Sequence, residues 1–190
     1  MAIGIGIALL SFFWPSVRFS QTDGLFDADR VASFVVSREQ IPAITKPTFE
    51  SVSRADEYLH DESRGVLVTM SGQQRFYPFA ILVWHGVVND VIAGRPIAVA
   101  YSPLTDEAIV FDRIGSDGLA TTFAWSGDVY ENSELLADTQ TDSRWWIQRL
   151  QAVSGPRAGE ALSEKIFFTP SWRAIKSEFP NADVLSRQTG

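Results

Sequence analysis

Two strand-like runs separated by two turn-forming residues limit the fold more than any other feature of this chain. Residues 65–70 and 73–77 are rich in β-branched and aromatic side chains, and Ser71 and Gly72 stand between them. Runs of this kind joined by two such residues predict a β-hairpin. By the same composition, further strands are expected at Ile97–Tyr101, Ala108–Asp112 and Leu119–Trp125.

Short helices are expected on either side of these strands. Ser53, with Asp56 three residues later, has the spacing of a capping box for a helix that ends by Gly65. The other two are expected from Pro78 through Trp84 and from Thr169-Pro170 through Phe179. Strands dominate the middle of the chain without alternating with helices. The sequence therefore predicts an α+β fold, a mostly antiparallel sheet that is open or barrel-like, with two or three short helices.

The 190 residues suffice for a single globular domain, expected over residues 31–190. Residues 1–30 are expected to form an apolar segment and a linker, because Ala2–Trp14 is almost wholly apolar and Gln21–Arg30 is polar. The apolar run is interpreted as an export signal or the remnant of a membrane anchor. A buried strand or helix is the alternative. The first interpretation predicts an exported or membrane-anchored, extracytoplasmic protein that meets the membrane only through this segment.

Composition narrows the classes of partner. The net charge is −7 and the chain has no run of Lys or Arg, which argues against nucleic-acid binding. It also has no cysteine, so disulfides, thiol nucleophiles and thiolate metal sites are excluded. A small molecule or a metal ion remains as the expected partner.

One segment carries a family resemblance. Residues 84–90 read Trp-His-Gly-Val-Val-Asn-Asp, residues 101–104 read Tyr-Ser-Pro-Leu, and residues 111–113 read Phe-Asp-Arg. The segment resembles a widespread bacterial family, domain of unknown function 3179, whose members typically carry Trp-His-x-x-Val-Asn-Asp and Tyr-Cys-Pro-Leu-Cys-Gly. The resemblance implies a family without implying an activity.

This chain departs from that family at polar positions. Ser102 and Thr105 stand where the family has two cysteines, and Asp106 stands where it has glycine. Hydroxyls do not replace thiolates as ligands for soft metals, so any thiol site of the relatives is expected to be lost here. In a later loop, Glu131 and Glu134 replace two asparagines of the family pattern.

His85 is the first candidate for chemistry, because a neutral imidazole can act as a general base or bind a metal. His85 and Asp106 are the candidate catalytic residues, and His85, Asp106 and Glu107 are the candidate ligands of a divalent metal. The alternatives are a core histidine bonded to a backbone carbonyl or to Asp90, and a solvated turn at 102–107.

A polar pocket is the other candidate site. Its expected ligand-binding residues are Tyr101, Ser102, Thr105, Ser126 and Asn132.

Three hypotheses follow from these residues. The leading one is an extracytoplasmic accessory module that binds a small ligand or a metal and has lost the family's thiol site. The second is a hydrolase or transferase in which His85 is the general base and a carboxylate or a metal activates water; a serine nucleophile at Ser102, with His85 and either Asp90 or Asp112, is a variant of it. The third is a purely structural interaction domain.

Overall fold

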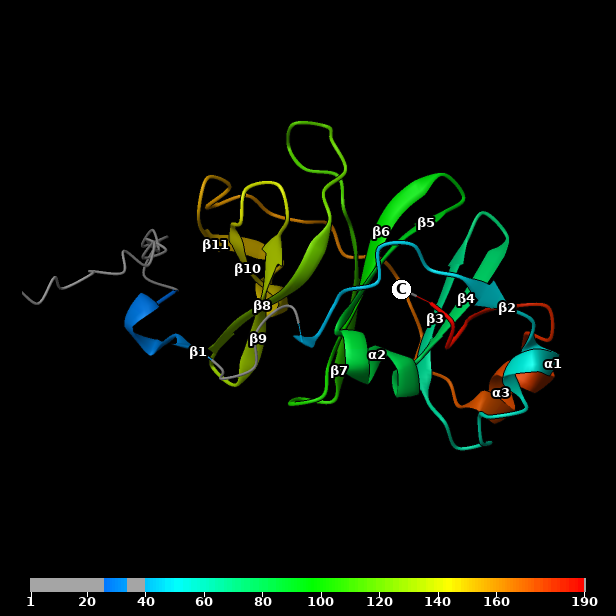
Figure 1. Ribbon diagram of the computed structural model, residues 1–190. Coiled ribbons are helices and arrows are strands. Elements are labelled where there is room, and N and C mark those ends of the chain that lie inside the picture. The colour runs from blue at the N-terminus through cyan, green and yellow to red at the C-terminus, as the bar shows by residue number, and fades with distance from the viewer. Residues whose placement is uncertain (1–25, 34–39, 190) are drawn as a thin grey trace, which may run out of the picture.

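The computed structural model describes residues 26–33 and 40–189, whose strands form three sheets (Figure 1). The five-stranded sheet has the order β1 (Ala32–Ser33), β8 (Phe123–Tyr130), β9 (Ser133–Asp138), β10 (Arg144–Trp146) and β11 (Gln151–Ser154). The four-stranded sheet has the order β2 (Phe49–Glu50), β12 (Asp183–Leu185), β4 (Gln73–Pro78) and β3 (Gly65–Met70). The middle sheet consists of β5 (Val87–Ile92), β6 (Arg95–Ser102) and β7 (Glu107–Asp112).

Among the described strands, pairing is antiparallel except between β12 and β4, which are parallel. The helices are α1 (Val52–Ala55), α2 (Phe79–His85) and α3 (Trp172–Glu178), with 3-10 turns η1 (Ala28–Arg30) and η3 (Ile147–Arg149). The predicted α+β fold is confirmed. The sheets do not close into a barrel within the described part of the chain.

The β3–β4 hairpin is present as predicted. Ser71 and Gly72 both have positive φ, 48° and 80°, as a type I′ turn requires. β6 and β7 also match their predicted strands. β6 begins two residues earlier and ends one residue later than predicted, and β7 begins one residue earlier.

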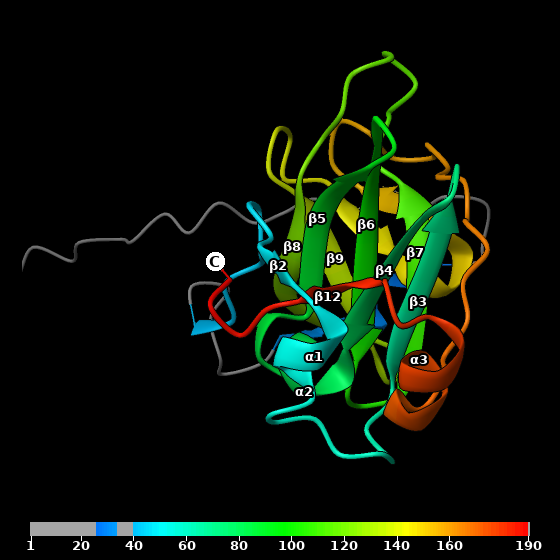
Figure 2. The same cartoon turned by 90° about the vertical axis from the view of Figure 1, so that its right-hand side faces the viewer.

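The middle sheet is buried on both faces, so its side chains alternate between two cores. On β6, Ile97 and Val99 face the four-stranded sheet and α2, whereas Ala98 and Ala100 face the five-stranded sheet. Strand geometry explains this, since successive side chains point to opposite faces. Figure 1 shows the β5–β7 strands between the other two sheets, and in Figure 2 the β3 and β4 strands lie in front of them.

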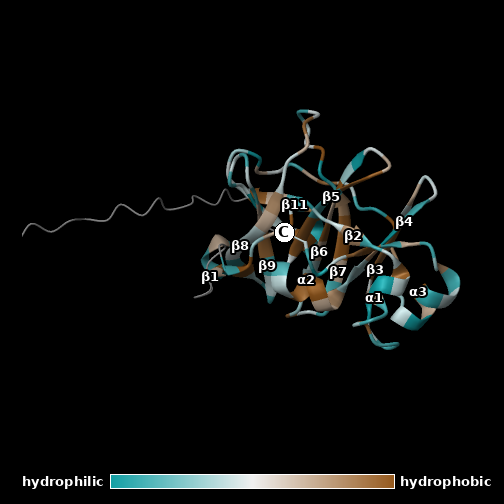
Figure 3. Cartoon of the chain, turned by 45° about the vertical axis from the view of Figure 1, so that its right-hand side comes forward, coloured by the Kyte–Doolittle hydropathy of each residue, from teal (hydrophilic) through white to brown (hydrophobic). Residues whose placement is uncertain are grey.

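Two further layers cover the outer faces. Leu67, Phe76 and Val184 of the four-stranded sheet pack against Trp172 and other residues of α1 and α3. At the opposite side, Phe26 is 3% exposed and its ring centroid lies 4.5 Å from that of Tyr130 on β8. Phe26 thus packs against the domain, although it lies within the stretch expected to be a linker. Figure 3 shows apolar ribbon concentrated in the strands and α2, and polar ribbon in most loops.

Three local predictions were wrong in detail. Ser51, rather than Ser53, caps α1 by accepting a hydrogen bond from the Arg54 amide. The helix expected from Thr169-Pro170 instead begins at Trp172, after Ser171 as its cap. The strand expected from Leu119 instead starts at Phe123 and runs to Tyr130, with an irregularity between Trp125 and Val129.

The apolar run Ala2–Trp14 lies outside the described residues. Of the helices in the described ranges, none is long and apolar enough to cross a membrane.

Candidate functional site

A cavity of about 330 Å³ lies where the β6–β7 hairpin ends, between α2 and the β8–β9 hairpin. Its volume falls at the lower end of the range for small-molecule sites. Apolar walls come from each side, including Phe79 and Val83 of α2, Trp125 of β8, Leu136 of β9 and Ile147 of η3. Polar groups come mainly from the β6–β7 turn and from β9.

Strand alternation places two consecutive residues on different walls of this cavity. Tyr101 continues the Ile97–Val99 face and stacks on Phe79, with ring centroids 4.2 Å apart and planes 14° apart. Ser102 continues the opposite face and donates a hydrogen bond to the Glu134 carboxylate of β9. The end of one strand therefore contacts both α2 and the five-stranded sheet.

Ser102 and Thr105, which replace the family's two cysteines, lie together in the turn. The Thr105 amide donates to Ser102 Oγ over 3.3 Å, and both residues line the cavity. Thr105 Oγ1 is buried and has no hydrogen-bond partner in the part of the chain that the structure describes. It is an exception to the rule that buried polar groups are hydrogen-bonded.

Asp106 lines the cavity, and two side chains hold its carboxylate in place. Arg64 Nη1 donates to Asp106 Oδ2 over 3.1 Å, and the Tyr101 hydroxyl donates to Oδ1 over 3.0 Å. These bonds, that of Arg64 first, hold the pKa of Asp106 below its usual value. Burial, together with the bond to Asp106, raises the pKa of Tyr101. Asp106 has a φ of 55°, a conformation that glycine adopts without steric cost, which suits the glycine of the family pattern.

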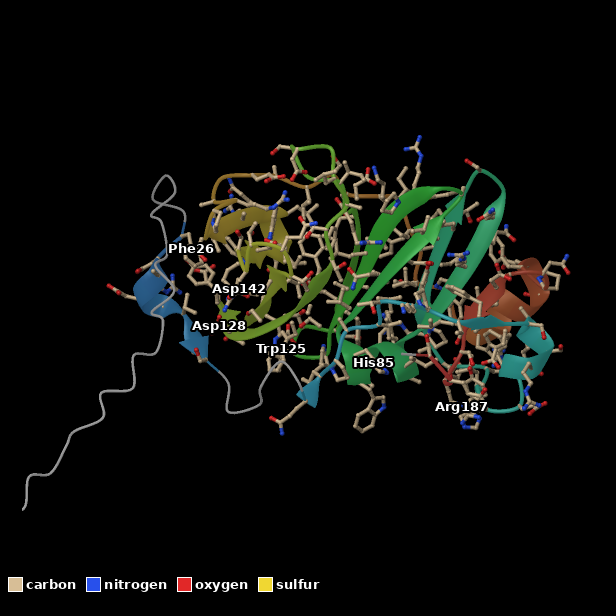
Figure 4. All side chains as sticks on the ribbon, turned by 45° about the horizontal axis from the view of Figure 1, so that its top comes forward. Phe26, His85, Trp125, Asp128, Asp142 and Arg187 are labelled. Atoms are coloured by element: carbon tan, nitrogen blue, oxygen red, sulfur yellow. The ribbon has the colours of Figure 1, made fainter. Side chains whose placement is uncertain are left out.

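His85 does not line the cavity, although its neighbour Gly86 does. It ends α2, is half-buried, and its Nδ1 lies 2.8 Å from the carbonyl oxygen of Pro42. This contact fits the structural alternative in which a backbone carbonyl satisfies the imidazole. Figure 4 labels His85 at the end of α2 and Trp125 on β8.

The predicted metal ligands do not form a site in the described ranges. No three His, Asp or Glu side chains are grouped there so as to hold a metal ion, so His85, Asp106 and Glu107 are not brought together as a ligand set. Glu107 lines the cavity, and the Asp106 carboxylate forms an ion pair with Arg64 and accepts a hydrogen bond from Tyr101.

Two predicted ligand-binding residues instead serve the β8–β9 hairpin. Asn132 is exposed and, with Glu131, forms its two-residue turn at φ of 65° and 48°. Ser126 Oγ accepts a hydrogen bond from the Asp128 amide over 3.0 Å at the irregularity in β8. Neither lines the cavity.

Asn89 and Asp90 of the family-like segment connect elements of the core. The Asn89 side chain both donates to the Phe123 carbonyl and accepts from its amide, each over 2.8 Å. Asp90 accepts from Arg75 and from Tyr77, each over 2.6 Å. Asp112 is likewise engaged, since its carboxylate lies 2.5 Å from Lys165 Nζ. These contacts give all three residues structural roles.

Of the polar residues that line the cavity, the sequence interpretation missed Arg64, Ser133, Glu134, Gln148 and Thr169. Glu134 carried a signal, because it departs from the family pattern at a polar position. Its place in β9 makes it face the cavity together with Leu136, two residues on. Nothing in the sequence marks Arg64 or Gln148 as a site residue, since each reaches the site only through the packing of separate elements.

Comparison with known proteins gave one match. The model of the family described as "Protein of unknown function (DUF3179)" matches residues 38–190. No curated protein and no solved structure matches the chain.

Proposed function

Because the chain belongs to the DUF3179 family, whose description names no activity, we propose from the cavity itself that this domain binds a small organic molecule. The proposal rests on the cavity of about 330 Å³, whose walls are mostly apolar and include a few polar side chains. Small-molecule sites have this composition, since apolar contacts supply affinity and a few polar groups fix orientation.

The polar groups support a binding role rather than catalysis. Ser102 Oγ accepts a hydrogen bond from the Thr105 amide and donates its own proton to Glu134, so it is held as part of the wall. His85, the expected general base, is bonded to the Pro42 carbonyl and lies outside the lining. Serine catalysis needs a nucleophile and a base that contact each other, and this contact is not seen between these two residues.

A fragment screen tests this proposal. We expect some neutral or charged aromatic fragments to shift the amide NMR signals of Tyr101, Ser102 and Glu134. Ala108→Phe places a ring at a half-buried residue of the lining and should abolish these shifts. Val91→Phe is the control, because Val91 lies in the same sheet, is 49% exposed and does not line the cavity.

A second blocking variant guards against misfolding of the first. Thr105→Phe fills the cavity from the turn instead of from a strand. The proposal fails if no fragment shifts the cavity signals, or if the shifts persist in both blocking variants while these remain folded by circular dichroism.

A further inference from the structure

Resting on the binding function proposed above, we propose that the cavity selects a small organic cation, such as a primary amine on an apolar body, and that Glu134 is its counter-charge. Four charged residues line the cavity: Arg64, Asp106, Glu107 and Glu134. Three of the four are acidic, so the lining has an excess of negative charge.

The single basic residue of the lining is already engaged. Arg64 pairs with Asp106 over 3.1 Å, and its guanidinium carbon lies 5.3 Å from the centre of the Phe79 ring. In residues 26–33 and 40–189, no Lys or Arg forms an ion pair with Glu107 or Glu134. Within the described residues, a cation that enters the cavity therefore finds two carboxylates, Glu107 and Glu134, that no Lys or Arg already pairs with.

Glu134 is the better placed of these two carboxylates. It is half-buried on β9, whereas Glu107 is exposed. Among the described residues, Ser102 alone donates to the Glu134 carboxylate, and it does so to Oε2. The Oε1 atom is left for a ligand. Because a half-buried carboxylate without a counter-charge is unfavourable, a bound cation is stabilised there more than a neutral group.

The walls favour an organic cation over a metal ion. Four aromatic residues line the cavity: Phe79, Tyr101, Trp125 and Phe167. Aromatic faces attract ammonium groups and pack against apolar bodies. A metal ion needs several oxygen or nitrogen ligands together, and no group of three candidate side chains is present among the residues described.

Three compounds of similar size and different charge test this inference: 2-phenylethylammonium, 2-phenylethanol and phenylacetate. Their dissociation constants are measured by NMR titration at pH 7 and low ionic strength. We expect the ammonium to bind about tenfold or more tightly than the alcohol, since a charge-assisted hydrogen bond is worth more than a neutral one. Phenylacetate should bind most weakly.

Glu134→Gln removes the charge and keeps the shape, so it should abolish the preference for the ammonium while the alcohol still binds. Glu131→Gln is the matched control, because Glu131 lies on the same hairpin, pairs with Arg30 over 2.7 Å and is outside the lining. It should leave the preference unchanged.

The outcomes separate the two proposals. Equal binding of the ammonium and the alcohol, or a preference that Glu134→Gln retains, overturns the cation inference and leaves small-molecule binding intact. If none of the three compounds binds, and the wider fragment screen also finds no ligand, both proposals fall.

Discussion

Asp90 is expected to be one of the most destabilising positions to truncate, although it looks like a catalytic carboxylate in the sequence. The residue is 5% exposed and its two oxygens accept three hydrogen bonds. Arg75 and Tyr77 donate from β4 to Oδ2, and the Val91 amide donates to Oδ1 over 2.7 Å. Asp90 therefore links the middle sheet to the four-stranded sheet. Asp90→Ala removes that link.

The magnitude follows from what the substitution leaves behind. The Tyr77 hydroxyl belongs to a residue of 0% exposure, and the Arg75 side chain is 17% exposed. Breaking a buried ion pair from one side costs about 3–5 kcal/mol, because the remaining charge stays buried. Arg75 keeps a 2.9 Å bond to the Val91 carbonyl, which places the expected loss near the lower end, at about 3 kcal/mol.

Urea unfolding followed by circular dichroism measures this loss. Asp183→Ala is the control, since Asp183 also faces Arg75 but lies 3.9 Å away and its side chain is 60% exposed. An exposed pair of this kind contributes about 0–1 kcal/mol. If Asp90→Ala unfolds within about 1 kcal/mol of Asp183→Ala, the argument that this buried network holds the two sheets together is refuted.

Two further substitutions test the assignments at the site. His85→Ala should lower the free energy of unfolding by about 1 kcal/mol, because it removes one hydrogen bond to Pro42. It should leave the affinity of the cavity for its ligand unchanged. A marked loss of affinity would restore a direct role for His85. Arg64→Ala should raise the pKa of Asp106 toward its usual value, measured by carboxyl-carbon NMR titration, and an unchanged pKa would contradict the assigned cause. Since the folded-state pKa is depressed, the stabilisation by this pair is present above the unfolded-state pKa and is lost as pH falls through the folded value.

Local signals predicted much of the fold. The β3–β4 hairpin depends on two adjacent residues with positive φ, which Ser71 and Gly72 supply within the sequence itself. The sequence alone does not decide the α1 cap, because Ser51 and Ser53 are both able to cap a helix. In the structure their hydroxyls contact each other at 2.9 Å. The choice between them depends on the direction from which the chain enters, which is a tertiary property.

The sequence predicted only the part of the site that comes from the end of β6 and the turn that follows it. Tyr101, Ser102, Thr105, Asp106 and Glu107 are close in sequence, and all of them line the cavity. The Ser102–Glu134 contact spans 32 positions and exists only because two sheets pack face to face. Periodicity within a strand specifies its two faces, but it does not specify which other sheet each face meets.

The position of β12 has a consequence for how the chain is made. Among the described strands β12 is the last in chain order, yet it inserts between β2 and β4, pairing with one antiparallel and with the other parallel. During synthesis β4 can pair with β3 while its other edge still has unpaired amide and carbonyl groups. An open strand edge is a template for association with other chains. Nascent chains that stall before residue 183 should therefore depend on chaperones in a way that the finished domain does not.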